Sequence, residues 1–456
     1  MSSTTLNAFF NPKSIAVIGA TDKPDRIGYQ VIRSLQLGKF EGTIYPINPR
    51  LEAVLELKAY PKIEAVPHPI DLAIIVLRKD RVLDAVDACG RKKVHSLIIM
   101  SSGFSELGDL TTELELGKRI RHYGMRLLGP NCAGFAATNE QIFASFEHRL
   151  QVGNLAFISQ SGAMCAVVLA MARAASLGFS MFVSYGNATD IGPEEILSYL
   201  ESHTPTTIIG CYLEGVQNAR HFLSVAKQIT PQKPIVVLKP GETYAASQAI
   251  QSHTGAMAGD QAIYTGAFRQ TGIIQVSTLE EFTDSCLILS QAPLPKGNSV
   301  GIITNSGGPG VLAVDACTRF GLEVNPFPTP LVKEFQTFLP PICPMINPVD
   351  LGPEASPATY QRVTAMLLNH AEVDMVLVLC VPTAFSDIKL ISEAVAKAHE
   401  DNPQKPLITC WLAEDIVKTG IPILHKAVIP NYPTPQRAAT ALSILRQRAV
   451  WLRIMS

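Results

Sequence analysis

Short apolar segments that alternate with longer helical segments are the feature that most limits how this chain can fold. Many of these segments are continuously apolar, as expected when helices cover both faces of a sheet. Strands that alternate with helices predict parallel sheets built from βαβ units. Three sets of candidate strands follow one another: 14–19, 43–47, 72–77, 97–100 and 126–128; then 155–158, 181–183, 207–212, 235–238 and 273–276; then 299–304, 322–324, 375–379, 407–409 and 427–429.

The length and one proline-containing segment suggest how these strands divide into domains. The 456 residues are enough for about three domains, at roughly 150 residues each. Residues 292–298 contain two prolines and one glycine, which extend neither a helix nor a strand, and they predict a linker. A second, less sharply marked boundary falls near 146–153. We therefore expect domains at 1–148, 149–292 and 298–456.

Composition excludes several classes of protein. The formal net charge is −1, so the chain has no basic surplus for nucleic acid or an anionic membrane. No apolar run approaches the ~20 residues of a transmembrane helix, and the N-terminus does not resemble a signal peptide. The nine cysteines include no CxxC pair, which favours free thiols in a reducing cytoplasm over disulfides or zinc. We expect a cytoplasmic protein without a metal site.

Two glycine-containing loops follow the same plan in the second and third domains. In each, a strand ends in a Ser-Gly loop that leads into a helix rich in small residues. Glycine lets a ligand approach the backbone, and the helix start offers N–H groups to an anion. Both loops are predicted to bind a shared phosphate, although one such loop alone could serve packing. The candidate residues are Ser159, Gln160, Ser161 and Gly162, with Asn305, Ser306, Gly307 and Gly308.

The first strand–helix turn, 19–28, does not match a dinucleotide site. A nicotinamide dinucleotide turn requires glycine where this chain has Thr21 and Pro24. Asn48 ends the second strand, where such enzymes carry an acid for the ribose hydroxyls. The turn can still place a phosphate at the helix start, or it is only a tight connection. An NAD-dependent oxidoreductase is therefore disfavoured.

His253 and Glu214 are the candidate catalytic pair. His253 lies in a segment, 241–260, dominated by glycine, alanine, serine and threonine, which is typical of a loop rather than a core. An imidazole that accepts a phosphoryl group needs one free nitrogen and a second nitrogen held by a partner. Glu214 follows the strand at 207–212 and is placed at the edge where ligands bind. A structural histidine and a solvated acid are the alternatives.

Together these motifs resemble the α-subunit of the ADP-forming acyl-CoA synthetases, relatives of succinyl-CoA synthetase, over essentially the whole chain. Residues 19–24 and 129–132 resemble the CoA-binding domain, and 159–162 and 252–256 resemble the phosphate helix and phosphohistidine loop. Residues 305–310 and 347–350 resemble the ligase-type third domain. The resemblance implies an α/β chain with a Rossmann-like CoA-binding domain and two flavodoxin-like, doubly wound parallel-sheet domains.

The resemblance also implies a site and a reaction. Phosphate attacks the thioester of acyl-CoA to give an acyl phosphate, His253 takes the phosphoryl group, and ADP receives it. Glu214 occupies the position of the acid that stabilises phosphohistidine. Family members often carry lysine where this chain has Arg50. The implied CoA contacts are Gly19, Ala20, Thr21, Asn48, Arg50, Ser101, Ser102 and Asn131.

One part of the family's machinery is not expected in this chain. The nucleotide site belongs to an ATP-grasp module with its own magnesium, and no segment of that size follows the third domain. We expect an ATP-grasp β-subunit that supplies Mg²⁺ and ADP or ATP, in an α2β2 assembly. A CoA-binding regulatory or scaffold protein, or part of a protein acetyltransferase system, are the alternatives. The acyl group and the direction of flux stay open.

Overall fold

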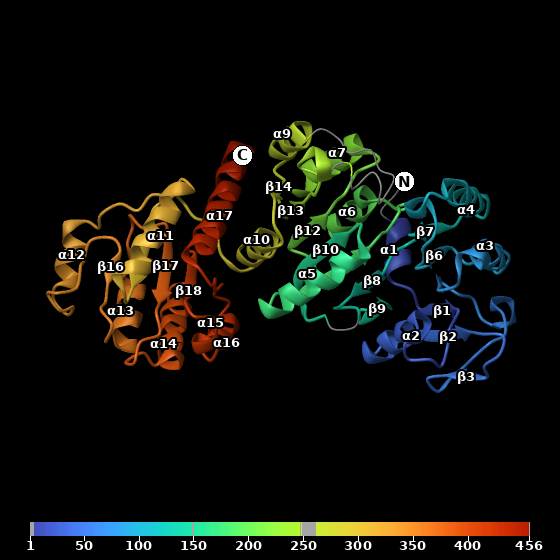
Figure 1. Ribbon diagram of the computed structural model, residues 1–456, viewed down its shortest axis with the longest axis horizontal. Helices are drawn as coiled ribbons and strands as arrows, with labels where there is room; N and C mark the ends of the chain where they lie inside the picture. The colour runs from blue at the N-terminus through green and yellow to red at the C-terminus, as the bar shows by residue number, and fades with distance from the viewer. Residues whose placement is uncertain (1–3, 148–149, 247, 249–260, 456) are drawn as a thin grey trace. The chain divides into compact units, whose positions relative to one another are not determined.

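The structure is a computed structural model that describes residues 4–147, 150–246, 248 and 261–455 (Figure 1). Its chain divides into two compact units, Met1–Leu279 and Glu280–Ser456. The first unit contains two large sheets and the second unit contains one. Within the described residues, no helix combines the length and the apolar character that crossing a bilayer requires.

The first sheet of unit 1 is parallel and doubly wound. Its strands are β1 (Ser14–Ile18), β2 (Thr43–Ile47), β5 (Leu72–Ile75), β6 (Ser96–Ile99) and β7 (Arg126–Leu128), and its helices are α1 (Thr4–Phe10), α2 (Ile27–Leu37), α3 (Val82–Arg91) and α4 (Leu110–His122). A small hairpin joins β3 (Ala53–Val54) to β4 (Leu57–Lys58). The order β2-β1-β5-β6-β7 reverses direction at β1, so a crevice forms beyond the carboxyl ends of β1 and β5.

The second sheet repeats this arrangement and adds an antiparallel edge. Its order is β14-β13-β12-β10-β11-β8-β9, so the chain reverses direction at β10. A second crevice therefore lies beyond the carboxyl ends of β10 and β12. The strands are β8 (Gly134–Ala137), β9 (Ile142–Ser145), β10 (Val152–Ser159), β11 (Phe179–Ser184), β12 (Ile208–Tyr212), β13 (Ile235–Leu238) and β14 (Ile274–Val276), and the helices are α5 (Gly162–Ala174), α6 (Pro193–Ser202), α7 (Ala219–Ile229) and α9 (Gln261–Thr271).

The two sheets of unit 1 share one continuous apolar core. The ring of Phe10 lies 4.9 Å from that of Phe135 and 4.8 Å from that of Tyr199, which joins α1 to β8 and α6. Arg126, the first residue of β7, donates hydrogen bonds of 2.8 Å to both Asp190 and Glu195. These contacts hold the crevices of the two sheets in a defined arrangement.

Unit 2 has a smaller parallel sheet of order β16-β15-β17-β18. Helix α11 packs against α17, and α13 packs against α14. Right-handed connections place these two helix pairs on opposite faces of the sheet. The strands are β15 (Val300–Thr304), β16 (Val349–Asp350), β17 (Met375–Cys380) and β18 (Leu407–Trp411), and the helices are α10 (Leu279–Gln291), α11 (Gly307–Arg319), α12 (Thr329–Phe335), α13 (Pro357–Asn369), α14 (Ile388–Glu400), α15 (Glu414–Val417), α16 (Ile421–Lys426) and α17 (Pro435–Met455).

Two strands predicted for the third set are wrong. Residues 322–324 form no strand, because only Glu323 makes an isolated bridge, to Ser299. Residues 427–429 follow α16 as a turn, and Val428 has a φ of 58°, which an extended strand does not allow. The edge beside β15 is instead taken by β16, which the sequence analysis did not predict.

Candidate active site

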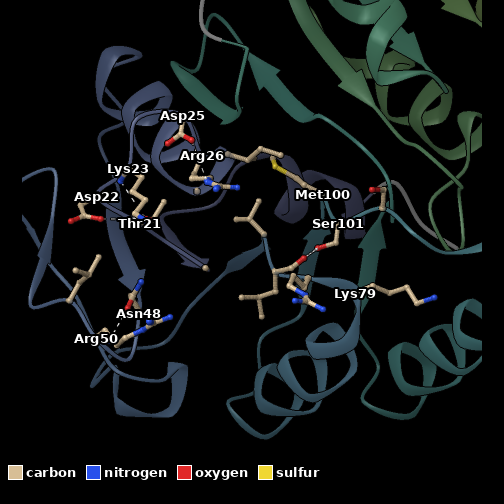
Figure 2. Close-up of a pocket in the computed structure, with 18 of the residues that line it drawn as sticks. Thr21, Asp22, Lys23, Asp25, Arg26, Asn48, Arg50, Lys79, Met100 and Ser101 are labelled. Carbon is tan, nitrogen blue, oxygen red and sulfur yellow. Dashed lines mark hydrogen bonds and ion pairs between the residues drawn. The ribbon is translucent and has the colours of Figure 1, made fainter.

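A cavity of about 1270 Å³ lies beyond the carboxyl ends of β1, β2, β5 and β6 (Figure 2). It occupies the crevice where the first sheet reverses direction, as the doubly wound topology predicts. Six of the eight residues predicted to contact CoA line it: Gly19, Thr21, Asn48, Arg50, Ser101 and Ser102. We call it the first cavity.

Two glycines allow neighbouring backbone segments to approach closely at the base of the first cavity. Gly19 has a φ of 95°, and a Cβ there would lie 2.4 Å from the carbonyl oxygen of Val76. A Cβ on Gly28 would lie 2.2 Å from the carbonyl oxygen of Gly19. Larger side chains would push α2 away from β1, so these glycines keep the helix start at the floor of the cavity.

The Asn48 side chain joins two of the loops that form the cavity. Its amide nitrogen donates to the Ala20 carbonyl at 2.7 Å, and its amide oxygen accepts from the Arg50 backbone N–H at 2.8 Å. Figure 2 shows Asn48 and Arg50 side by side at the end of β2. Ala20 itself is 1% exposed and is not a lining residue, so its predicted contact with CoA is not through its side chain.

Basic side chains around this cavity were missed by the sequence analysis. Lys23, Arg26, Arg78 and Lys79 line it together with Arg50. Arg26 pairs with Asp25 at 3.5 Å, Arg78 pairs with Asp80 at 3.2 Å, and Lys79 pairs with Asp109. In the described part of the chain, Lys23 and Arg50 have no ion-pair partner, and the five basic lining residues outnumber the three acidic ones, Asp22, Asp25 and Asp80. Each basic residue lies shortly after a strand end, and that placement was a usable signal.

The surplus of positive charge and the glycine floor fit CoA. Its 3′-phosphate and diphosphate carry several negative charges, which lysine and arginine recognise. Helix α2 begins at Ile27, and its first backbone N–H groups can also bind an anion. An acidic residue for ribose hydroxyls is absent from position 48, which agrees with a ligand other than a nicotinamide dinucleotide.

A second cavity, of about 830 Å³, lies beyond the carboxyl ends of β10, β11 and β12. It shares Ile27, Met100 and Ser102 with the first cavity, so the two adjoin. It gathers predicted residues that are far apart in the sequence: Asn131, Gln160, Ser161, Gly162 and Glu214. The start of α5 and Glu214 therefore line a space that is continuous with the first cavity.

Gln160 ties the start of α5 to the loop that carries Glu214. Its side-chain oxygen accepts from the backbone N–H groups of Glu214 at 3.1 Å and Gly215 at 3.2 Å. Ser161 caps α5, because its hydroxyl accepts from the Met164 N–H at 3.3 Å. Ser159 is fully buried and donates to the Ser161 carbonyl at 2.8 Å, so it supports the loop without lining the cavity.

Glu214 is a buried acid among aromatic and basic neighbours. It is 6% exposed, and it lines the second cavity. Burial, and then the negative charge of Glu214, raise the pKa of the neighbouring Tyr212 to about 12. Burial lowers the pKa of Lys239, and the carboxylate of Glu214 partly offsets this. The Tyr212 phenol stays protonated and neutral at physiological pH, so it adds no charge beside Glu214, whereas Lys239 adds a positive one.

Asn187 connects both sheets at this cavity and was not predicted. Its side-chain nitrogen donates to Glu106 at 2.7 Å and to Glu113 at 2.9 Å, and its side-chain oxygen accepts from Asn131 at 3.2 Å. Asn131 follows Gly129 and Pro130 and has a φ of 58°. The network fixes one wall of the second cavity, and its partners are too distant in sequence to be recognised from a motif.

The matching loop of unit 2 has its predicted residues at the start of α11. Asn305 is 2% exposed, and its amide exchanges two hydrogen bonds of 2.8 Å with the backbone of Val381. Gly307 and Gly308 are exposed, and Ser306 is half-buried. The Asn305 side chain therefore ties β15 to β17, and the exposed glycine N–H groups are the ones that face solvent.

His253 lies outside the described residues, so its contact with Glu214 stays a prediction. Over the described ranges, which omit 249–260, no group of three histidine, cysteine, aspartate or glutamate side chains is arranged to hold a metal ion. The described cysteines are all buried thiols that form no disulfide. Burial raises the pKa of Cys132, which lines the second cavity, to about 12, so its thiol stays protonated.

Three family models match successive parts of the chain. A CoA binding domain matches residues 13–138, a succinyl-CoA ligase like flavodoxin domain matches 152–289, and a Ligase-CoA domain matches 300–455. The α subunit of ADP-forming acetate–CoA ligase II from Pyrococcus furiosus is 37% identical over 450 residues, which cover 97% of this chain and 98% of that subunit. The chain belongs to the ADP-forming acyl-CoA synthetases.

Other members of the ADP-forming acyl-CoA synthetases support this assignment. ADP-forming acetate–CoA ligase I from Archaeoglobus fulgidus is 37% identical over 96% of this chain, which spans 63% of that longer protein. Acetyl-coenzyme A synthetase 1 from Ca. Korarchaeum cryptofilum, solved with phosphate and ADP, is 35% identical, with a TM-score of 0.93 over 98% of this chain and 97% of that chain. The predicted family and α/β fold are confirmed. The domain boundaries and the roles of individual site residues stay predictions.

Proposed function

We propose that this chain is the α-subunit of an acid–thiol ligase that interconverts acyl-CoA, ADP and phosphate with the free acid, ATP and CoA. The observation that carries the proposal is the junction of the two cavities in unit 1. A basic, glycine-floored cavity adjoins a cavity that holds a helix start and a buried carboxylate. This arrangement suits a thioester that meets phosphate at the end of a bound CoA.

The residues divide the work as follows. Lys23, Arg50 and the start of α2 bind the phosphates of CoA. Gly162 and Ala163, at the start of α5, offer N–H groups to inorganic phosphate, which attacks the thioester carbonyl and releases CoA. The acyl phosphate then gives its phosphoryl group to His253, and the free acid leaves. Glu214 accepts a hydrogen bond from the other imidazole nitrogen and stabilises the positive charge on the ring.

The nucleotide step belongs to a second subunit in this proposal. Relatives of matching length are named as α subunits, and a longer relative carries additional sequence. We place ADP or ATP and Mg²⁺ on an ATP-grasp β-subunit, in an α2β2 complex. Phosphohistidine then passes its phosphoryl group to ADP and regenerates His253. Acetate is the default acid because relatives are named for it.

The test is phosphoryl labelling of the complex purified with its partner subunit. Radioactive ATP with Mg²⁺, or acetyl-CoA with radioactive phosphate, should give a label that is stable in base and lost in acid. His253→Asn should abolish the label and turnover while CoA binding, measured by calorimetry, is unchanged. The matched control is His122→Asn, an exposed histidine at the end of α4. A label that survives in His253→Asn would refute the phosphoryl-carrier role, and CoA binding without turnover would favour a scaffold.

A further inference from the structure

Lys239 is a buried cation that the proposed mechanism leaves unexplained. It follows the carboxyl end of β13, directly before the segment that carries His253. Its side chain is 2% exposed and is not among the residues lining the second cavity. A lysine is rarely buried to this extent without a function or a partner, because removing an ammonium group from water costs several kcal/mol.

The contacts of Lys239 join three elements at one edge of the sheet. Its ammonium donates to the backbone carbonyl of Glu214 at 3.4 Å and to that of Pro240 at 3.3 Å. It also lies 4.4 Å from the ring centre of Tyr264, in α9. Pro240 precedes the segment 241–260 and Tyr264 follows it, so one ammonium links both ends of that segment to the loop of Glu214.

Lys239 acts on Glu214 through its positive charge as well as through its hydrogen bond to the Glu214 backbone carbonyl. Burial disfavours an ionised carboxylate, and an ionised Glu214 accepts a stronger, charge-assisted hydrogen bond from an imidazole N–H than a neutral carboxyl group does. Among the described residues, the other titratable groups around Glu214 include the phenols of Tyr212 and Tyr185, which become more costly to ionise near Glu214, and Glu194, which lines the same cavity and also raises the pKa of Tyr185. Neither phenol supplies a positive charge, and Tyr264 contacts the ammonium through its ring.

We propose that Lys239 is a positioning residue for Glu214, whose carboxylate it keeps ionised and whose loop it holds against β13. The proposal rests on the proposed function, in which Glu214 stabilises phosphohistidine. Lys239 touches neither CoA nor phosphate in this scheme, and it acts only through Glu214. Its substitution should therefore lower the rate of phosphoryl transfer without weakening the binding of acyl-CoA.

The chain offers a matched control for this lysine. Lys233 precedes the opposite end of β13 and donates to the carbonyls of Leu200 at 2.7 Å and His203 at 2.9 Å. Burial lowers the pKa of both lysines. Lys233 lies at the amino end of the strand, away from the second cavity. Loss of either lysine removes a carbonyl-bound ammonium, but only Lys239 is close to Glu214.

The experiment compares Lys239→Met with Lys233→Met in the complex with the partner subunit. Near pH 7, Lys239→Met should lower phosphohistidine formation and kcat by about 10- to 100-fold, with KM for acetyl-CoA within about twofold. The acid limb of its pH–rate profile should move up by about one to two pH units, so activity recovers in part at higher pH. Lys233→Met should keep the profile of the parent, and Lys239→Arg should restore much of the rate.

A double-mutant cycle isolates the link to Glu214. If Lys239 acts through the carboxylate, adding Lys239→Met to Glu214→Gln should lower the rate by less than about twofold. A further 10-fold loss in that background, or a pH profile that Lys239→Met does not shift, would overturn the proposal. The proposed function fails separately, if His253→Asn keeps its label. Thermal unfolding of each variant distinguishes a lost fold from a lost charge.

Discussion

The loops that precede α5 and α11 have nearly the same internal hydrogen bonds. Ser159 donates to the carbonyl two residues later at 2.8 Å, and Thr304 does the same at 2.8 Å. The next residue in each loop, Gln160 or Asn305, uses its side-chain amide to hold the loop after a neighbouring parallel strand. The sequence pattern that the two loops share therefore holds each loop in place where its sheet reverses direction.

The two loops differ in what they hold. Gln160 fixes the backbone of Glu214, an acid that lines a cavity, whereas Asn305 fixes Val381, an apolar residue that follows β17. In both units the side-chain amide bonds to backbone atoms. In unit 1 the residue that it holds carries a carboxylate, whereas in unit 2 that residue carries an apolar side chain. The comparison shows that the hydrogen bonds of the glycine loop stabilise the fold in both units. Whether the loop can take part in a reaction depends on which residue follows the adjacent strand.

The largest effect should come from the acid that only the first loop positions. Glu214→Gln keeps the size of the side chain but removes the charge that stabilises an imidazolium-like ring. Losing a charge-assisted hydrogen bond of about 2–3 kcal/mol lowers kcat roughly 30- to 150-fold. Steady-state turnover and phosphohistidine yield measure it, with the exposed Glu201→Gln as control. Full activity in Glu214→Gln would remove the functional difference between the two loops.

Gln160 and Asn305 each join two loops through a side-chain amide, and substituting them should separate an effect on turnover from an effect on stability. Gln160→Leu frees the loop of Glu214, so we expect kcat to fall by roughly 10-fold with a smaller loss of stability. Asn305→Leu leaves the backbone N–H of Val381 without its Asn305 partner, while the Val381 carbonyl keeps a hydrogen bond from Ser386, so the free energy of unfolding should fall by about 1–3 kcal/mol. Turnover and denaturant unfolding of both variants provide the measurements.

The opposite pattern would be equally informative. If Asn305→Leu abolished turnover and kept its stability, the amide would contact phosphate, as the sequence analysis predicts for both loops. Equal losses of activity in the two variants would mean that the loop of unit 2 has a catalytic part of its own.

The fold was predictable where strands are continuously apolar and several residues long. The strands of both sheets in unit 1 that carry the cavities were predicted; Leu72–Ile75, for example, has no polar interruption. Short segments were not reliable: β16 has two residues after Pro348, and 427–429 is apolar but contains the left-handed Val428. The antiparallel β8 and β9 were missed because Gly134–Ala137 is poor in β-branched residues.

The site was predictable only to the level of which residues follow strand ends. Parallel strands bring their carboxyl ends to one edge, so Asn48, Gln160 and Glu214 could be placed there from the sequence. Their hydrogen-bond partners could not be, because they depend on packing: Gln160 meets Glu214 across 54 positions, and Asn187 meets Glu106 across 81. Side chains predicted as ligand contacts therefore include some that hold loops together.

The smallest effect should come from Ser161 and Ser306, the residues that directly precede the two helices, because a side-chain cap is made only in the first loop. Ser161 caps α5 by accepting from the Met164 N–H at 3.3 Å, whereas Ser306 makes no side-chain cap to α11. Ser161→Ala should therefore cost about 1 kcal/mol, equivalent to roughly 2 °C in Tm for unit 1, and Ser306→Ala should cost less than about 0.5 kcal/mol. Differential scanning calorimetry of the two variants measures this difference. If Ser306→Ala instead lowered turnover at unchanged Tm, its hydroxyl would be free for a ligand because it caps no helix, and the two loops would share phosphate binding after all.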